Sequence, residues 1–337
     1  MIAALFVVML HYPFPGREGT IVNCLARFAV PMFFAVSGYF NYGVDGNRIA
    51  KRAKHILRLN IVGTVMYVLW YIYVLMKIGN INIPEVLKLK LSPVNIVKWL
   101  FINVNPFAGH MWYLSALLTA YILLWAYAKF FEGRKISYTP LYIVGICLMS
   151  LHFVLSTGSI LAGMTVPYLV YRNGLLLGLP MMIFGIFVNE HGDRIVENFR
   201  LTSVKSFALM IAGAFLSLLQ WKAFGKAEMP VGAFVTVVFL MLFMAHNPQV
   251  PVLGKWLGGV MRHMGNVSLA VYITHILFGN MIVLFSAENE KILAIKENGY
   301  LNPIAIMLLS VLAGIIYALL SSCFNKVKKL IFKETQV

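Results

Sequence analysis

The fold is decided by MIAALFVVMLHYPF (residues 1–14), NCLARFAVPMFFAVSGYF (residues 23–40) and NRIAKRAKHILRLN (residues 47–60). The first piece is an apolar run that ends at His11. The second is an apolar helix of membrane length, with Ser37 and Gly38 near its far end. The third is strongly basic. One short stretch thus contains a titratable imidazole, a Ser-Gly pair and a basic patch of the size of a phosphate group. This combination suggests group-transfer chemistry.

The composition is that of a membrane protein. Of the 337 residues, 60% are hydrophobic and 12% are charged, whereas soluble domains carry about 25% charged residues. No polar stretch is long enough to fold alone, so we expect one integral membrane domain over residues 1–337. The net charge of +16 lies mostly in short loops, where it orients the chain and contacts membrane lipids rather than nucleic acid.

Apolar runs of about the length of one membrane crossing recur along the chain. They predict an all-α fold, a polytopic transmembrane helix bundle of about ten spans. The expected spans are residues 1–13, 24–42, 59–78, 110–128, 136–156, 170–189, 204–221, 230–246, 266–286 and 302–323. The segment 79–109 is expected to be a loop on the headgroups, or an amphipathic or re-entrant helix.

The basic residues orient this bundle. With the N-terminus inside, the inner loops and the C-terminal tail carry 17 Lys and Arg, and the outer loops carry 8. This is the bias that the positive-inside rule describes. We therefore expect both termini in the cytoplasm and His11 near the outer face.

The first apolar run is short for a membrane crossing, which needs about 20 residues. It also lacks the basic segment and the small-residue cleavage site of a secretory signal. We expect the first span to be truncated, with the natural start of the protein upstream of Met1.

Three histidines are candidates for chemistry. His11 titrates near neutral pH and would serve as a general base, or is only an interfacial polar residue. His110 opens a span from the outside beside Trp112, and with Arg172 it would line a cavity for a polar acceptor; an aromatic belt is the alternative for Trp112. His275 is expected near the membrane centre, deeper than His11, with a structural hydrogen bond between helices as the alternative.

Two features face the cytoplasmic side. Ser37 and Gly38 permit close approach by a ligand, or simply by another helix. The basic run with Arg52, Lys54 and Arg58 fits the phosphates of a cofactor, or anionic lipids. No Gly-rich phosphate loop accompanies it, which argues against an ATPase. The cysteines and histidines show no metal-ligand spacing, so we expect no metal.

Five stretches, in this order, relate the chain to a known family: IAALFVVMLH (2–11), RFAVPMFFAVSGYF (27–40), KRAKHILRL (51–59), HMWYLSALL (110–118) and GNVSLAVYITHILF (265–278). Together they resemble the acyltransferase-3 family, bacterial membrane proteins that O-acylate surface sugars and related acceptors. The family pattern has an arginine eleven residues before the first-span histidine, which would fall at position 0 here and again indicates truncation. The family's paired arginines are matched loosely, by Arg58 with His55.

The resemblance implies an enzyme, an acyltransferase in the bacterial inner membrane. The donor would be acetyl-CoA or another acyl-CoA on the cytoplasmic side. Its phosphates would contact Arg52, Lys54 and Arg58, and its thioester would pass Ser37 and Gly38.

The resemblance also implies roles on the acceptor side. His11 matches the essential first-span histidine and would be the general base on a hydroxyl of a cell-surface or lipid-linked glycan of the cell envelope. His275, His110 or Arg172 would orient groups or stabilise the oxyanion, and Arg172 and Trp112 would contact the acceptor.

Two other functions remain open. One is a transporter or flippase for glycan intermediates without covalent chemistry, and the other is a structural subunit of a polysaccharide export complex. All twelve acidic residues are predicted to lie in loops or at span ends, whereas ion-coupled carriers usually place carboxylates within the membrane. This favours O-acetylation, or a related acyl transfer, over transport.

Overall fold

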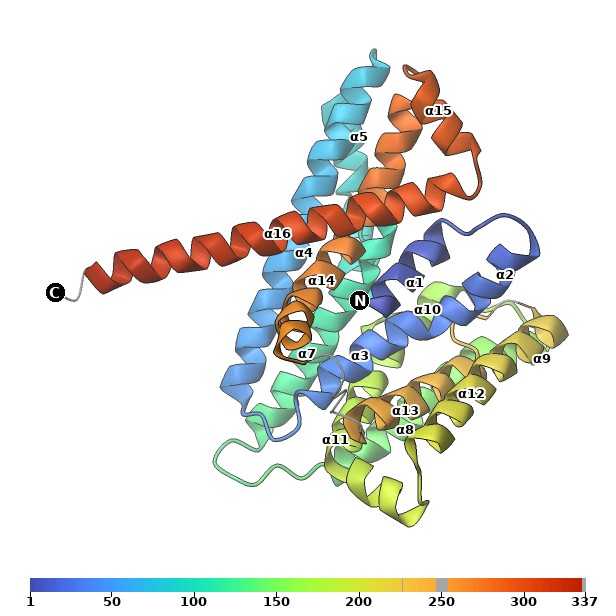
Figure 1. Cartoon of the computed structure of the whole chain (residues 1–337), viewed down its shortest axis with the longest axis vertical. Helices are drawn as coiled ribbons and strands as arrows, with labels where there is room; N and C mark the ends of the chain where they lie inside the picture. The colour runs from blue at the N-terminus through green and yellow to red at the C-terminus, as the bar shows by residue number, and fades with distance from the viewer. Residues whose placement is uncertain (226, 247–253, 335–337) are drawn as a thin grey trace. The chain divides into compact units, whose positions relative to one another are not determined.

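The computed structural model describes residues 1–225, 227–246 and 254–334. Helices and their connections make up this described part, which contains no β-strand (Figure 1). The prediction of an all-α fold is therefore confirmed. The chain forms two compact units. Unit 1 comprises Met1–Ala26 with Gln249–Val337, and unit 2 comprises Arg27–Pro248.

Eight helices within the described ranges are long and apolar enough to cross a membrane, and each falls on one of the predicted spans. They are Gly16–Tyr39, Gly46–Ile78, Gly109–Phe130, Thr139–Leu161, Gly174–Asn198, Ser203–Phe224, Val267–Phe285 and Leu301–Ser322. The two remaining predicted spans correspond to shorter apolar helices, Ile2–His11 and Val231–Met244. The membrane bundle is confirmed, but the count of ten crossings is not.

Unit 1 is built from five helices of its described residues: α1 (Ile2–His11), α2 (Gly16–Leu25), α14 (Gly254–Phe285), α15 (Glu290–Glu297) and α16 (Leu301–Glu334). Helix α14 packs along α16, and α1 packs against α14. At Gly314 of α16 an added Cβ would lie 3.0 Å from the carbonyl oxygen of Val267. The small residue therefore lets the two long helices approach closely.

The chain passes into unit 2 through the short 3-10 turn η1 (Ala26–Phe28). The longer helices of this unit are α3 (Ala29–Tyr39), α4 (Gly46–Ile78), α5 (Ile83–Lys90), α6 (Pro93–Ile102), α7 (Trp112–Phe130), α8 (Thr139–Phe153), α11 (Leu179–Asn198), α12 (Ser203–Phe224) and α13 (Val231–His246). Its short elements are η2 (Gly109–Met111), η3 (Val154–Gly158), α9 (Ser159–Leu161), α10 (Tyr168–Tyr171) and η4 (Gly174–Gly178).

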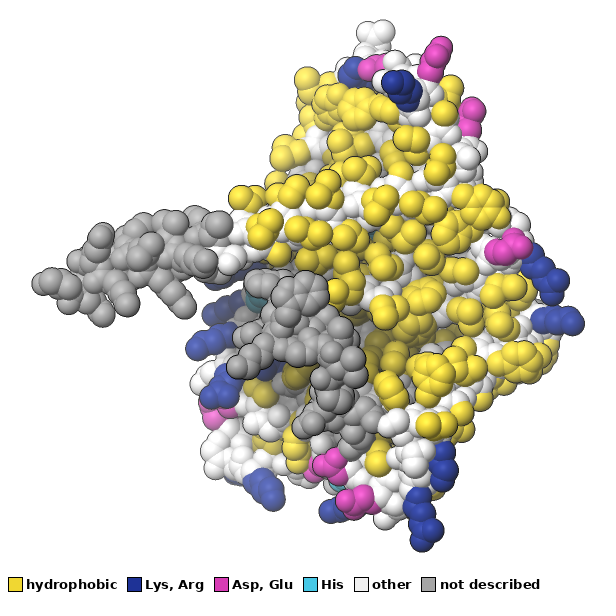
Figure 2. Space-filling model, in the orientation of Figure 1, with side chains coloured by type: hydrophobic (Ala, Val, Ile, Leu, Met, Phe, Trp, Pro, Cys, Tyr) yellow, Lys and Arg dark blue, Asp and Glu magenta, His cyan; other side chains and the backbone are white. Residues whose placement is uncertain are grey.

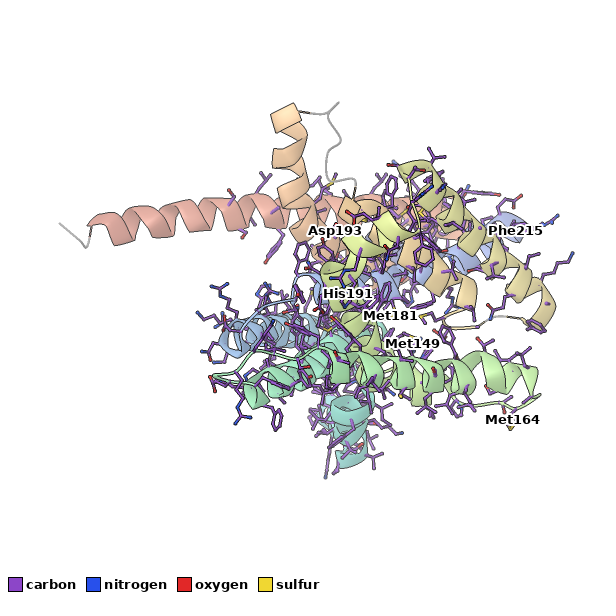
Figure 3. All side chains as sticks on the ribbon, turned by 90° about the horizontal axis from the view of Figure 1, so that it is seen from below. Met149, Met164, Met181, His191, Asp193 and Phe215 are labelled. Atoms are coloured by element: carbon purple, nitrogen blue, oxygen red, sulfur yellow. The ribbon has the colours of Figure 1, made fainter. Side chains whose placement is uncertain are left out.

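Helix α11 lies at the centre of unit 2, where it packs against α3, α8 and α13. Met149 of α8 and Met181 of α11 are buried at this contact (Figure 3). Phe215 of α12 is exposed, as is Met164 in the connection after α9. The apolar centre of this unit therefore forms around α11, while α12 presents apolar side chains outward.

Helix α4 has 33 residues, a length of about 50 Å at 1.5 Å per residue, which exceeds the hydrocarbon core of about 30 Å. Because α4 begins at Gly46, the basic run that was expected in a loop forms the first turns of this helix. Asp45 caps the helix by accepting a hydrogen bond from the backbone N–H of Arg48 at 3.0 Å. This hydrogen bond lowers the pKa of the Asp45 carboxyl.

The segment 79–109 contains two short helices, α5 and α6, rather than a plain loop. Leu100 and Phe101 of α6 are exposed, whereas the Trp99 Nε1 donates a hydrogen bond to the Ser115 Oγ of α7 at 3.1 Å. One face of α6 is thus hydrogen-bonded to α7, and another face is apolar and exposed. This agrees with the alternative of an interfacial helix.

Large apolar side chains cover much of the face that Figure 2 shows. Along α16, for example, Leu308, Leu319 and Leu320 are each more than 60% exposed. A soluble monomer rarely exposes contiguous apolar patches of more than a few hundred Å². Such a helix face is suited to contact with lipid.

Candidate active site

Two imidazoles lie side by side in unit 1. His11 ends α1 and is exposed, whereas His275 of α14 is fully buried, and their ring centroids are 5.2 Å apart. The Nδ1 of His275 lies 3.1 Å from the carbonyl oxygen of Val271 and 2.8 Å from that of Tyr272. Because carbonyls only accept hydrogen bonds, Nδ1 carries the hydrogen, and Nε2 bears the lone pair of the neutral ring. The pair thus consists of an exposed imidazole, that of His11, and a buried imidazole, that of His275, whose tautomer is fixed.

Local contacts place this pair. The Asn23 side chain of α2 donates a hydrogen bond to the carbonyl oxygen of Leu10 at 3.1 Å, which pairs one of the open carbonyls in the last turn of α1. Tyr12 then crosses α14 at Gly279, where an added Cβ would lie 1.8 Å from the Tyr12 hydroxyl oxygen. Gly279 is one helical turn beyond His275. Asn23, Tyr12 and Gly279 were not identified from the sequence, because only the packing of α1 on α14 brings them to the pair.

The two histidines differ less in depth than the sequence predicted. Their depths can differ by no more than the 5.2 Å between the ring centroids, well below the roughly 15 Å from the surface to the centre of the hydrocarbon core. The position of His275 in the sequence places it along its own helix, but it carries no information on where α1 ends beside that helix.

His110 lies in unit 2, in the turn η2 that opens α7. Its buried ring meets the ring of Tyr67 from α4 nearly edge-on, at a centroid distance of 5.0 Å. Further along α7, the Ser115 Oγ accepts hydrogen bonds from the Asn60 side chain at 2.9 Å and from Trp99 at 3.1 Å. The start of α7 is therefore a buried polar junction with α4 and α6, and a catalytic role for His110 stays a prediction.

Gly38 lies at the contact between α3 and α11, and Ser37 precedes it on α3. The Ser37 hydroxyl donates a hydrogen bond to the carbonyl oxygen of Phe33 at 2.8 Å. A Cβ at Gly38 would lie 1.9 Å from the carbonyl oxygen of Met182, and one at Gly185 would lie 1.9 Å from that of Ala35. Helix packing, the alternative named above, accounts for Gly38. Contact of these two residues with a donor stays a prediction.

The three basic residues of α4 differ in their surroundings. Arg52 donates hydrogen bonds to the carbonyl oxygen of Phe40 at 2.5 Å and to the Asn41 Oδ1 at 2.8 Å, which fixes the connection between α3 and α4. Lys54 and Arg58 are exposed and lie one turn apart on the same helix face. A donor phosphate would therefore meet Lys54 and Arg58 more readily than Arg52.

Arg172 follows α10 and lies against two aromatic rings. Its guanidinium carbon is 5.0 Å from the ring centroid of Trp112 and 4.1 Å from that of Tyr168. The Glu228 Oε2 accepts from Arg172 at 3.4 Å and from Arg27 at 3.0 Å. Arg27 and Glu228 were not identified from the sequence. The sequence does contain one indication of this cluster. Arg27 is an ionisable residue inside a predicted span, and such residues in membrane proteins often belong to functional sites.

The backbone after Arg172 is held on α7. The Asn103 side chain accepts a hydrogen bond from the Gly174 N–H at 2.8 Å and donates one to the Thr119 Oγ1 of α7 at 3.0 Å. A Cβ at Gly174 would lie 2.6 Å from the carbonyl oxygen of Ala116, one turn along α7 from Trp112. These contacts keep Arg172 beside Trp112.

The connection that carries Glu228 is fixed in a similar way. The Gln220 side chain accepts a hydrogen bond from the Val231 N–H at 2.9 Å and donates one to the Thr157 Oγ1 at 3.2 Å. The Glu228 side chain itself is 24% exposed. The carboxylate thus lies in a fixed, partly buried position.

Comparison with known proteins gives the family. A serine/alanine racemase from Enterococcus gallinarum is 23% identical over 332 residues, a match that covers 92% of this chain and 43% of the racemase. The chain thus spans less than half the length of that relative. No solved structure matches significantly. A family described as an acyltransferase domain matches residues 1–323, nearly the whole sequence. The chain therefore belongs to the acyltransferase-3 family, and its helices form an acyltransferase domain.

Proposed function

We propose that this protein is a membrane O-acyltransferase that moves an acyl group, in the simplest case acetyl, from cytoplasmic acyl-CoA to a hydroxyl of a cell-surface or lipid-linked glycan. The His11–His275 pair is the observation that carries this proposal, and family membership supports the reaction class. A sugar hydroxyl is a poor nucleophile at neutral pH, so transfer from a thioester needs a base beside it. An exposed imidazole with a fixed neighbour suits that task.

In the proposed reaction His11 carries the proton from the acceptor hydroxyl to the leaving thiolate. His11 takes the hydroxyl proton while the acceptor oxygen attacks the thioester carbonyl carbon. The carbon–oxygen bond forms, the carbonyl electron pair moves onto its oxygen, and its return breaks the carbon–sulfur bond. The proton passes from His11 to the leaving sulfur, and coenzyme A departs as the thiol.

His275 acts as a positioning residue for His11 in this scheme. Its Nδ1–H is already engaged by the carbonyls of Val271 and Tyr272. A neutral His275 therefore has no second N–H to offer a developing oxyanion, and the expected oxyanion role is not favoured. Ring contact with His11 remains, which fixes the orientation of the base.

The donor would bind at the start of α4. Lys54 and Arg58 are exposed in the first turns of this long helix, which face the cytoplasm in the predicted orientation. Both would contact the phosphates of coenzyme A, with Arg52 holding the connection to α3. Arg172, Trp112 and His110 would serve the acceptor. This assignment corresponds to a protein of the bacterial inner membrane with cytoplasmic termini.

The experiment is acylation of envelope glycan in membranes supplied with labelled acetyl-CoA. General-base assistance is worth about 100- to 10,000-fold. His11→Gln should therefore lose at least about 100-fold of the rate, because an amide does not take up the proton. His191→Gln is the matched control, since His191 lies on α11 beside Glu190 in the other unit.

Two results would contradict the proposal. One is a near wild-type rate for His11→Gln at equal protein levels in the membrane. The other is unlabelled glycan with the wild-type protein, which would favour a transporter or flippase. A loss restricted to His11→Gln and His275→Gln supports the proposed pair.

A further inference from the structure

Two guanidinium groups share one carboxylate oxygen in unit 2. Arg27 and Arg172 both contact the Glu228 Oε2, at 3.0 Å and 3.4 Å. The side chains of Arg27, Arg172 and Glu228 are only 12%, 22% and 24% exposed. Two positive charges therefore face one negative charge in a partly buried place, and the cluster carries one positive charge in excess.

The donors of both arginines are incompletely used. The Nε atoms of Arg27 and Arg172 are buried, and no hydrogen-bond partner for them occurs in the part of the chain that the structure describes. A guanidinium offers five N–H donors in a fixed fork, which matches the paired oxygens of carboxylate and phosphate groups. A buried donor or charge without a partner is costly. The cluster is thus complementary to one further anionic group.

The aromatic rings hold Arg172 without neutralising it. Trp112 and Tyr168 lie 5.0 Å and 4.1 Å from its guanidinium carbon. Cation–π contacts attract the cation but leave its charge and its in-plane donors in place. The π-helical turn η4 begins two residues beyond Arg172, and such turns are frequent at functional sites. Arg172 is therefore fixed in position while it keeps the capacity to bind an anion.

The cluster lies far from the proposed donor site. Gly46, at the start of α4, lies near the Lys129 side chain at the end of α7, with 3.4 Å between an added Cβ and the Lys129 Cγ. Trp112 begins α7, about 25 Å from Lys129 at 1.5 Å per residue. In the predicted orientation the Arg172 end faces outward. An anion there is not a coenzyme A phosphate held at the start of α4.

We propose that Arg27 and Arg172 bind a phosphate or carboxylate group of the acceptor, so that the accepted glycan is acidic or phosphate-linked rather than neutral. This inference rests on the proposed acyl transfer for its link to an acceptor. Glu228 occupies the two guanidinium groups in the absence of the acceptor and competes with its anion.

The test is anion binding to the full-length protein in detergent, followed by tryptophan fluorescence. Trp112 is one of six tryptophans and lies against Arg172, so Trp112→Phe should remove the response. The probes are glucose 1-phosphate, glucuronate and neutral glucose. We expect a saturable response to at least one anionic probe and none to glucose.

Variants that remove a positive or a negative charge from the cluster make the test more specific. Arg27→Gln and Arg172→Gln should weaken binding by about tenfold or more, as expected for a lost charge-assisted contact. Glu228→Gln should tighten it, because the internal competitor is removed. Lys222→Gln also removes one positive charge, but from an exposed position at the end of α12, and should leave binding unchanged.

Several results would overturn the inference. They are equal responses to glucose and glucose 1-phosphate, equal weakening by Lys222→Gln, and weaker binding by Glu228→Gln. A response only to nanodiscs containing phosphatidic acid would make this a lipid site and would also overturn it. The acylation assay on the same protein separates the two proposals. Transfer without anion binding refutes only this inference, and anion binding without transfer refutes only the proposed function.

Discussion

Replacing Gly38 by alanine tests whether this glycine serves helix packing or ligand approach. The added Cβ would lie 1.9 Å from the carbonyl oxygen of Met182, whereas Cβ atoms essentially never come closer than 3.0 Å to such an atom. Relief requires α3 and α11 to separate by about 1 Å, because the obstacle is backbone and the interior is close-packed. A gap of that size forfeits a quarter to a half of each dispersion contact along the seam.

We expect Gly38→Ala to lower the free energy of unfolding by about 3 kcal/mol, the upper end for overpacking. Gly185→Ala meets the Ala35 carbonyl oxygen at the same 1.9 Å and should cost as much. One displacement of α3 from α11 relieves both clashes. The double variant should therefore cost little more than either single variant, rather than their sum.

Thermal unfolding of the purified protein in detergent measures this cost. Gly158→Ala is the control, because its Cβ would meet only the Phe153 carbonyl oxygen, at an ordinary 3.5 Å. Unchanged stability of Gly38→Ala with a raised Michaelis constant for acetyl-CoA would refute the packing argument and return Gly38 to the donor path. Additive costs in the double variant would refute the shared displacement.

Four further predictions concern α4 and the orientation of the chain. Arg52→Ala should lower stability, by about 1.5–3 kcal/mol for its hydrogen bonds to Phe40 and Asn41, with little change in the Michaelis constant for acetyl-CoA. Lys54→Ala with Arg58→Ala should raise that constant without loss of stability. The Asp45 cap stabilises α4 above the usual carboxyl pKa and is lost as the pH falls through its lowered value. Asp45→Asn should keep the cap and remove this acid dependence of unfolding. Reporter fusions at Glu132 and Lys255 should be cytoplasmic and one at Glu290 external, and the opposite signal at Glu290 would refute the orientation.

Hydrophobic length and charge predicted most of the fold. Within the described residues, eight of the ten expected spans are helices long enough to cross a membrane, because the bilayer imposes a minimum length on each. Helix starts were less predictable. The second span begins at Gly16 rather than at residue 24, since its first part, GREGTIVNCL, is too polar to register as apolar sequence. The basic run of α4 was placed in a loop for the same reason.

The candidate site was predicted only where one residue carries the signal. His11, His275 and Arg172 are rare polar groups in apolar surroundings, and each attracts attention alone. Glu228 lies in a short connection between spans, where a carboxylate is unremarkable. Its pairing with Arg27, 201 positions away in sequence, depends on how η1 and the connection between α12 and α13 meet. Sequence periodicity holds no information on such a contact.

The glycines show why the sequence of this chain does not distinguish a glycine that admits a ligand from one that serves helix packing. Lipid is as apolar as leucine, so helices in a membrane gain little from burying apolar surface and rely on close contact instead. Gly38 and Gly185 provide that contact between α3 and α11. Gly213 and Gly232 do so between α12 and α13, where added Cβ atoms would lie within 3 Å of the opposite backbone. A buried glycine here is therefore explained first by a helix seam. The chemistry is left to the polar groups beside such helix contacts. Substitutions at His11, Arg172 and Glu228 therefore discriminate among functions directly, whereas a glycine substitution does so only when its effect on stability is measured beside its effect on the kinetics.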